Sequence, residues 1–346
     1  MEEKGCIGIP RALMFYRYFP LWNTFFQRLG WRVMVSEGVK PKEKIIYFED
    51  SCLPMKLLVT HAAQLKDSVD HLFIPRLVSL HPTYIMCPKF RGAPDIVRLA
   101  TEGKVSILDE TVDLRRGGIP LLRAFLNIGE KLGATTHESR RAFREAQRSF
   151  SRFQEDWGNR INRLSARQLF EEDIPTPSPP EVGSPAGGIG MGSSFRIAFI
   201  GHPYNLLDVD INKDLLALAK SLEMEIVTSD SLSEKEINRE VCDLSKEIYW
   251  SSGREIVGSL FHFLSGGVDG VVFLTSFKCG IDALLQEFIK RRLKVRGGPS
   301  VPLLILSFDE HTGREGLITR LEAFRDVVEE QKKLGSSNVK YQSSNE

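Results

Sequence analysis

The chain has 346 residues, of which 42% are hydrophobic and 26% are charged. Lys and Arg number 46 against 45 Asp and Glu, so the net charge does not point to nucleic acid or a membrane surface as a partner. The length is typical of two domains, and no apolar run approaches the roughly 18 residues that indicate a membrane span.

The start of the chain and its cysteine content both bear on the compartment. The first expected strand, Cys6–Ile9, begins almost at the initiating Met, which leaves no room for a cleavable secretory signal. The five cysteines are an odd number without compact spacing, so they do not resemble a disulfide framework. We therefore expect a cytoplasmic protein with reduced thiols.

Residues 1–120 are expected to form a first α/β lobe, because apolar, β-branched runs alternate there with helical patterns. The predicted strands are Cys6–Ile9, Arg32–Val35, Ile45–Phe48, His71–Ile74 and Lys104–Leu108. The predicted helices are Trp22–Leu29 and Met55–Leu65. The aromatic stretch Phe15–Phe19 is more typical of packing at an interface between the lobes than of a ligand-binding motif.

The pattern then changes to a charged helical segment, expected over 121–173, in which Ser139–Arg152 is typical of a solvated helix face. Residues 174–194 are dense in Pro, Gly and Ser, which predicts a flexible linker. A second α/β lobe is expected over 195–330, followed by a polar tail, 331–346. Its predicted strands are Arg196–Ile200, Glu225–Thr228, Gly270–Leu274 and Leu303–Ser307.

The two lobes share local patterns. Gly8-Ile9-Pro10 follows the first strand of one lobe, and Gly201-His202-Pro203 follows that of the other. The next strand lies 23 residues further on in both, since 33 − 10 and 226 − 203 are equal. Asp70–Ile74 likewise resembles Asp269–Phe273. The predicted fold is therefore α/β, with two Rossmann-like parallel-sheet lobes, a helical insertion between them and a cleft where they meet.

Three cysteines, Cys52, Cys87 and Cys279, lie far apart in the chain, each followed within two residues by Pro or Gly. This setting places each sulfur at a loop tip after a strand, the edge of an open α/β sheet where ligands bind. Thiolates that converge there predict an iron–sulfur cluster with three protein ligands, placed in the cleft between the lobes. The alternative for each cysteine is a small buried hydrophobic residue.

A cation lies close in sequence to each of these cysteines: Lys56, Lys89 and Lys278 respectively. Positive charge favours the thiolate and would raise the reduction potential of a cluster. Cys6 and Cys242 lack such neighbours. Cys6 is expected inside a strand and Cys242 on a helix within Asn238–Ile248, so both are interpreted as ordinary structural residues.

Other loops after strands carry candidate functional residues. Arg11 stands at a helix entrance, and Arg76 follows a strand as a candidate cofactor-binding residue. Glu310 and His311 follow the last predicted strand, and His311 could donate a proton or a hydrogen bond to a ligand. His311, Glu310 and Arg11 are the catalytic candidates. No phosphate-binding loop or dinucleotide fingerprint supports nucleotide hydrolysis or nicotinamide chemistry.

Seven short motifs carry a resemblance to a known family: Gly8–Leu13, Cys52–Lys56, Ile74–Ser79, Cys87–Phe90, Gly201–Asn205, Lys278–Gly280 and Asp309–Gly313. They resemble those of the acyl-CoA dehydratase activase-related proteins, which are relatives of the 2-hydroxyglutaryl-CoA dehydratase and benzoyl-CoA reductase subunits. The resemblance covers most of the chain apart from the helical middle, the linker and the tail.

The resemblance implies a [4Fe–4S] cluster held by Cys52, Cys87 and Cys279. In the dehydratase relatives one iron keeps a non-cysteine ligand and can bind substrate, after an ATP-hydrolysing activase delivers one low-potential electron. It thus implies a separate activase or low-potential electron donor as partner, an acyl-CoA substrate, and a dimer or hetero-oligomer.

Three functions remain open from the sequence. The chain is a dehydratase-like lyase or a reductase that acts on an acyl-CoA or related substrate, or it is a component that relays electrons to a partner enzyme. The third is a metal-free α/β binding protein whose cysteines pack.

Overall fold

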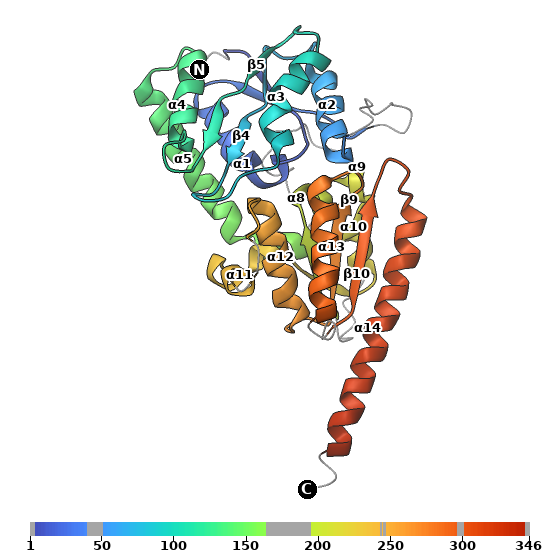
Figure 1. Ribbon diagram of the computed structural model, residues 1–346. Helices are drawn as coiled ribbons and strands as arrows, with labels where there is room; N and C mark the ends of the chain where they lie inside the picture. Colours follow the sequence, from blue (N-terminus) through green and yellow to red (C-terminus); the bar gives the residue numbers. More distant parts are fainter. Residues whose placement is uncertain are drawn as a thin grey trace.

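The computed structural model describes residues 4–39, 51–163, 195–242, 244, 247–295 and 301–342 (Figure 1). The expected strand Ile45–Phe48, the expected linker 174–194 and the last part of the expected helical segment lie outside the described residues. Among the residues described, no helix is both long and apolar enough to cross a membrane.

The first lobe is built on a parallel sheet of strands β2, β1, β3 and β5, in that order. Their bounds are Arg32–Val35, Cys6–Ile9, His71–Phe73 and Ser106–Leu108. Helices α1 (Phe15–Arg28), α2 (Leu53–Leu65) and α3 (Pro88–Ala100) accompany this sheet. Every residue of β1, Cys6 included, is buried, as expected for a strand covered on both faces. Parallel strands and helices confirm the predicted fold class of this lobe.

Helix α1 begins at Phe15, seven residues before the predicted start. Phe15, Phe19 and Phe26 are fully buried, and their helical spacing turns them to one face. Pro20 lies inside the helix, where proline removes a backbone hydrogen bond, so local propensity opposes a helix at this position. Burial of the aromatic face outweighs the hydrogen bond that Pro20 cannot make.

A second, two-stranded parallel sheet was not predicted. It pairs β4 (Arg76–Ser79) with β6 (Thr111–Asp113). The expectation that Arg76 lies in a loop after a strand was therefore wrong, because Arg76 begins β4. Neither strand is a continuous apolar run, because β4 reads Arg-Leu-Val-Ser and β6 reads Thr-Val-Asp, so neither was recognised in the sequence.

The helical middle is three helices instead of one stretch: α4 (Leu121–Lys131), α5 (Thr136–Glu155) and α6 (Trp157–Arg163). A reciprocal capping box between Thr135 and Glu138 begins α5. Helix α5 packs on α1, and the arginines of its outer face, such as Arg144 and Arg148, are exposed as predicted. Trp157, the first residue of α6, donates a 3.4 Å hydrogen bond to Thr228 of the second lobe.

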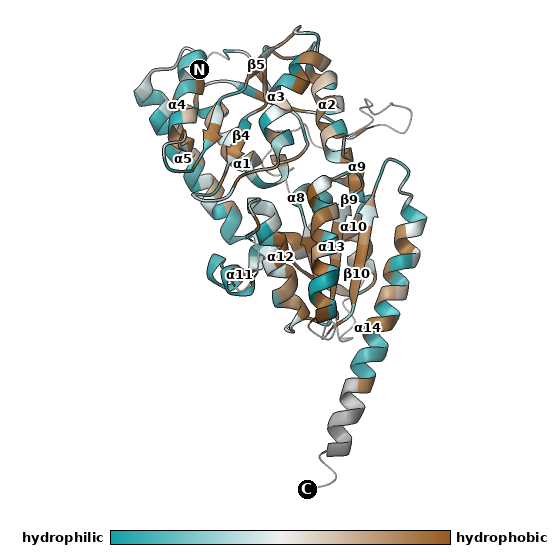
Figure 2. Ribbon diagram, viewed as in Figure 1, coloured by the Kyte–Doolittle hydropathy of each residue, from teal (hydrophilic) through white to brown (hydrophobic). Residues whose placement is uncertain are grey.

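The second lobe has a parallel sheet in the order β8, β7, β9, β10. Their bounds are Met224–Val227, Phe195–Gly201, Gly270–Ser276 and Leu303–Phe308. The accompanying helices are α8 (Pro203–Leu207), α9 (Val209–Asn212), α10 (Leu215–Ser221), the 3₁₀ turn η1 (Ser229–Ser231), α11 (Glu234–Val241), α12 (Ser251–Leu264), α13 (Gly280–Val295) and α14 (Arg314–Gln342). Strand β10 is hydrophobic along most of its length (Figure 2).

Two expectations about this lobe were wrong. Helix α14 continues through the predicted domain boundary at residue 330, so most of the expected polar tail is helical (Figure 1). Helix α11 ends at Val241, and Cys242 is exposed just beyond it and not on a helix face. Its Sγ donates to the backbone oxygen of Arg239, three residues back.

The lobes share their strand order and one repeated contact. The backbone N–H of Cys6 donates to Asp70 at 2.7 Å, and that of Arg196 donates to Asp269 at 2.8 Å. The glycine motif, however, stands at a different position relative to the strand pairing in the two lobes. Gly8 pairs with Met34 and Leu72, and the residue that pairs equivalently in the second lobe is Ala198, not Gly201. Strand β7 therefore runs three residues further before its Gly-His-Pro turn (201 − 198).

Candidate metal centre

The three predicted ligands all stand at helix N-termini. Cys52 and Cys87 are the N-caps of α2 and α3, each followed by Pro in the first turn, and Cys279 directly precedes α13. Cys279 alone among them closely follows a described strand, β9. Cys87 follows a single bridge between Ile85 and Trp250 that joins the lobes. The positive end of each helix dipole favours a thiolate, so this shared setting suits anionic sulfur ligands.

Electrostatic interactions link the three cysteines where the lobes meet. The thiols of Cys52 and Cys279, from different lobes, hydrogen-bond to each other. Tyr204 is buried beside them, and its burial together with the charges of Cys279, Asp282, Cys52 and Cys87 raises its pKa well above the ordinary value. Three cysteines that are remote in the sequence therefore occupy one neighbourhood.

Within this neighbourhood the thiols differ in acidity. The hydrogen bond from Cys279 lowers the pKa of Cys52 to about 6, and the ammonium of Lys89, 3.9 Å from Cys52 Sγ, also lowers it. The hydrogen bond to Cys52 and burial raise the pKa of Cys279, and burial raises that of Cys87. Cys52 is therefore the first of the three to ionise, with Cys279 as its hydrogen-bond donor.

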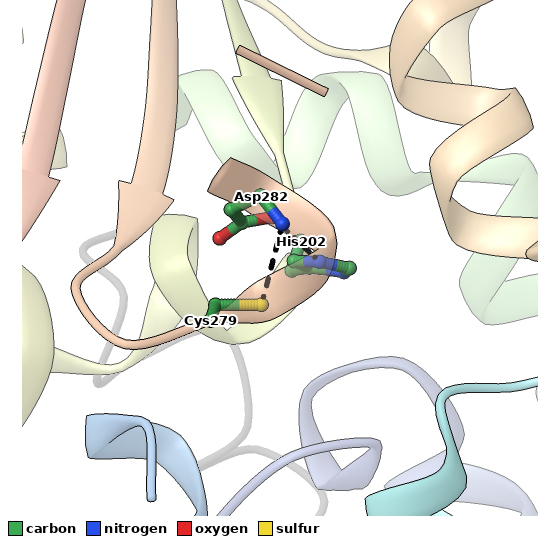
Figure 3. A group of neighbouring side chains, drawn as sticks. All are labelled: His202, Cys279 and Asp282. Atoms are coloured by element: carbon green, nitrogen blue, oxygen red, sulfur yellow. Dashed lines mark hydrogen bonds and ion pairs between the residues drawn. The ribbon is translucent and has the colours of Figure 1, made fainter. Parts of the chain in front are cut away.

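Two further residues of the site were missed by the sequence analysis, His202 and Asp282. His202 is the N-cap of α8, and Asp282 lies in the first turn of α13; their side chains are 4% and 1% exposed. His202 Nε2 and Asp282 Oδ1 are 3.1 Å apart (Figure 3). The Asp282 N–H also points at Cys279 Sγ, 3.5 Å away. A ring nitrogen, this sulfur and a carboxylate oxygen lie within 4.8 Å of one another.

Local sequence explains the placement of His202 and Asp282. A Cβ on Gly201 would lie 2.6 Å from the Leu274 carbonyl oxygen, so only glycine lets β7 approach β9 this closely before His202. Asp282 Oδ2 accepts a 2.8 Å hydrogen bond from the Ser276 N–H, which closes the turn between β9 and α13. The signal for both lay in two short motifs, Gly-His-Pro-Tyr and Cys-Gly-x-Asp, but neither predicts that the two meet.

Electrostatics hold His202 and Asp282 as a pair. Burial lowers the pKa of His202, but the Asp282 carboxylate and Cys52 raise it, and the net shift is upward. The His202 ring stacks on Tyr204, with ring centroids 4.8 Å apart and an angle of 12° between the planes. The stacking and the contact with Asp282 give the imidazole a defined orientation beside Cys279.

The four predicted cofactor-binding cations have different surroundings. Lys89 contacts Cys52, as described above, whereas Lys278 is exposed although it precedes Cys279. Lys56 is buried and forms an ion pair with Glu310 of the second lobe. Arg76 binds Asp95 through two hydrogen bonds of 2.7 and 3.0 Å and lies 3.4 Å from Asp109. Lys89 thus contacts a cysteine sulfur, whereas Lys56 and Arg76 form ion pairs with carboxylates.

The three catalytic candidates have partners away from the cysteines. Glu310 pairs with Lys56, and His311 is exposed, with its N–H donating to Asp309. Arg11 faces the second lobe, where Asp208 and Asp210 raise its pKa against the effect of burial.

A cleft of about 380 Å³ opens between the lobes, beside His202 and Tyr204. Arg17 lines it and donates to both carboxylate oxygens of Glu255, at 3.2 and 2.9 Å. Of the described residues, three carboxylates and two guanidinium groups line this cleft: Asp230, Glu234, Glu255, Arg17 and Arg254. With His81 and His202 also in the lining, the described residues of the cleft provide no marked excess of positive charge for an anionic group such as the phosphates of CoA.

The sequence profile of one protein family, described as CoA enzyme activase uncharacterised domain, matches residues 6–232, which is more than half of the chain. The chain belongs to this family. The match confirms the activase-related resemblance. It covers the first lobe, the helical middle and the first part of the second lobe, and it includes two of the three cysteines.

Other comparisons add little to the family assignment. No curated protein matches the chain. Among solved structures, the laminin-binding protein Lbp of Streptococcus pyogenes aligns over 94% of this chain and 100% of its own, at 11% identity and a TM-score of 0.27. So loose a superposition carries no inference about this family member.

The donor set fits an iron–sulfur cluster. Thiolates are the ligands that such clusters use, and here three of them come from separate helix N-termini into one buried neighbourhood. His202 Nε2 and Asp282 Oδ1, which pair with each other across 3.1 Å, lie next to Cys279. The residues present could therefore hold a cluster at the lobe interface.

Proposed function

We propose that this protein holds a [4Fe–4S] cluster on Cys52, Cys87 and Cys279 and takes part in low-potential one-electron chemistry on an acyl-CoA or related substrate. The convergence of the three cysteines at the lobe interface carries the proposal. Family membership supports the acyl-CoA context and implies a separate ATP-dependent activase, or another low-potential donor, as the source of electrons.

The surroundings of the sulfurs also support a redox role. Three helix N-termini and Lys89 place positive charge around the thiolates, which partly offsets the negative charge of a cluster and stabilises its reduced form. When bound, the cluster would supply one-electron transfer. The protein would supply its insulation, since Cys52 and Cys279 are both buried.

Iron and sulfide analysis of protein purified or reconstituted without oxygen tests the proposal. We expect brown protein with about four irons and four sulfides per chain. Cys279→Ser should remove most of this iron, whereas the matched change Cys242→Ser, at an exposed cysteine outside the site, should not. Colourless protein after reconstitution would refute the cluster and favour a metal-free binding protein.

A second candidate is an electron relay that serves a partner enzyme and has no substrate of its own. The composition of the cleft favours it, because carboxylates outnumber guanidinium groups there and CoA phosphates are anionic. An acyl-CoA added to the reduced protein would then leave the cluster spectrum unchanged, whereas the protein with its cluster oxidised would take an electron from a reduced activase. A spectrum perturbed by acyl-CoA would support the enzyme instead.

A further inference from the structure

The surface next to Cys279 carries large apolar side chains in contact with solvent. Phe277, two residues before Cys279, is 57% exposed, and Leu284, on α13, is 54% exposed. Gly280 and Ala283 lie between them in the chain and are exposed as well. Helix α13 runs along the outside of the second lobe, and its first turn is the end that lies toward the first lobe (Figure 1). Apolar side chains grouped on a surface mark interaction sites.

The turn that leads into Cys279 has an unusual backbone. Lys278 has a φ of +61°, in the left-handed region that residues with a side chain seldom adopt. On one side of it the Phe277 N–H donates to the carbonyl oxygen of Phe308, at 2.8 Å. On the other side the Cys279 N–H donates to that of Ser276, at 3.0 Å. The chain thus leaves Phe277 and Lys278 exposed while it buries Cys279, and backbone outliers of this kind concentrate at functional sites.

Positive charge surrounds these apolar side chains. Between residues 277 and 295 the exposed cationic residues outnumber the exposed carboxylates, and they are Lys278, Lys290, Arg291 and Lys294 against Glu287. Glu287 also pairs with Arg291 at 2.7 Å, which neutralises its charge. A surface that is apolar near Cys279 and cationic beyond it is complementary to an acidic protein surface with an apolar centre.

We propose that the exposed side of residues 277–294 is the docking surface for the protein that delivers electrons to the cluster. The partner that fits it is a low-potential iron–sulfur protein with acidic side chains around its own centre. This inference rests on the proposed function, which supplies the cluster bound by Cys279. One electron passes from the partner, which is oxidised, to the cluster, which is reduced, and no bond is made or broken. Electron transfer between proteins requires the two centres to be close, and Cys279 lies directly behind this surface.

Binding of an acidic [4Fe–4S] ferredoxin to the reconstituted full chain, measured by isothermal titration calorimetry, tests the docking surface. We expect binding that weakens as salt is added, because opposite charges attract across the interface. Phe277→Ser and Lys278→Glu should each weaken it about tenfold. The matched controls are Leu99→Ser on α3 and Arg148→Glu on α5, both at exposed residues of the first half of the chain. They should bind the ferredoxin as the natural chain does.

Stopped-flow reduction of the oxidised cluster gives a second readout. At ferredoxin concentrations below the dissociation constant, the variants Phe277→Ser and Lys278→Glu should be reduced about tenfold more slowly than the natural chain. Titanium(III) citrate, a small reductant that needs no docking, should reduce the variants and the natural chain at equal rates. Equal slowing with both reductants would show that the substitutions disturb the cluster, and it would overturn the docking surface.

Three other results would also overturn the inference. These are ferredoxin binding that neither variant weakens, a natural chain that does not bind the ferredoxin, and a dimer of the natural chain that Phe277→Ser dissociates. The last would assign the surface to a second copy of the chain. All three leave the proposed function standing, because the cluster is still present. A chain that takes up no iron would refute the proposed function, and this inference with it.

Discussion

Lys56 of helix α2 forms an ion pair with Glu310, which lies between β10 and α14, and so joins the first lobe to the second. The Lys56 side chain is only 1% exposed, whereas that of Glu310 is 22% exposed. A buried ammonium needs a counter-charge, because burial of an unpaired ion is strongly unfavourable. The sequence analysis expected Lys56 to bind the cofactor and Glu310 to be catalytic. In the structure the two side chains form an ion pair with each other.

Removal of Glu310 should therefore destabilise the protein. Glu310→Ala leaves the Lys56 ammonium buried without its carboxylate, and we expect the free energy of unfolding in urea to fall by about 2 kcal/mol, since solvent screens the partly exposed Glu310. The double variant Lys56→Met with Glu310→Ala should recover most of this loss. Glu315→Ala, at an exposed residue of α14, is the control. An equal loss in the control would contradict the prediction.

Asp208 should make stability fall as pH rises. Burial, more than the nearby Asp210, raises the pKa of Asp208 to about 7 in the folded protein. Between its unfolded pKa of about 4 and about 7 the folded state holds the extra proton, so stability is complete below pH 4 and is lost progressively toward pH 7. A rise of this size corresponds to at most about 4 kcal/mol of stability. Asp208→Asn should flatten this part of the pH profile of unfolding, and an unchanged slope would show that Asp208 is not its source.

Of Cys52, Cys87 and Cys279, the apo protein should be alkylated first at Cys52. Its pKa is lowered to about 6, while those of Cys87 and Cys279 are raised, so at pH 7 Cys52 carries the largest thiolate fraction of the three. After brief iodoacetamide treatment, peptide mass spectrometry should find a larger labelled fraction at Cys52 than at Cys87 or Cys279. Lys89→Met should slow the labelling of Cys52, because the ammonium 3.9 Å away is lost. Lys278→Met, at an exposed lysine, should leave the labelling rate of Cys52 unchanged. A larger effect of Lys278→Met than of Lys89→Met would contradict this electrostatic explanation.

The repeated aspartate contact should have similar weight in both lobes. Asp70→Ala and Asp269→Ala each remove a carboxylate that accepts a strand N–H, and each should lower the free energy of unfolding by about 1–3 kcal/mol. Asn at either position keeps an acceptor and should recover part of the loss. The two Ala changes should add, since the contacts lie in different lobes. Urea unfolding measures all of these, and a loss confined to one lobe would argue that the contacts are not equivalent.

Sequence periodicity was most reliable for the strands of the two four-stranded sheets, of which β1 and β2 were predicted with their observed bounds. The buried strands β7 and β9 were located to within two residues, because apolar, β-branched runs have few other structures available to them. Helix α1 was located in part, since local propensity at Pro20 opposed a helix that burial of the aromatic face stabilises. The short strands β4 and β6 depend on pairing with each other, which no local pattern records.

The sequence by itself determined the fold class and the family, and it predicts the three cysteines as ligands, because turn residues and motif letters are local properties of the chain. Only the tertiary structure decided which groups meet them. It brings His202 and Asp282 to Cys279, pairs Lys56 with Glu310, and leaves Lys278 exposed. The physical reason is that side-chain contacts between lobes depend on sheet register and helix packing. Gly201 lies three residues beyond Ala198, which is the structural counterpart of Gly8. Such a shift changes the spatial neighbours of each motif residue without changing the motif itself.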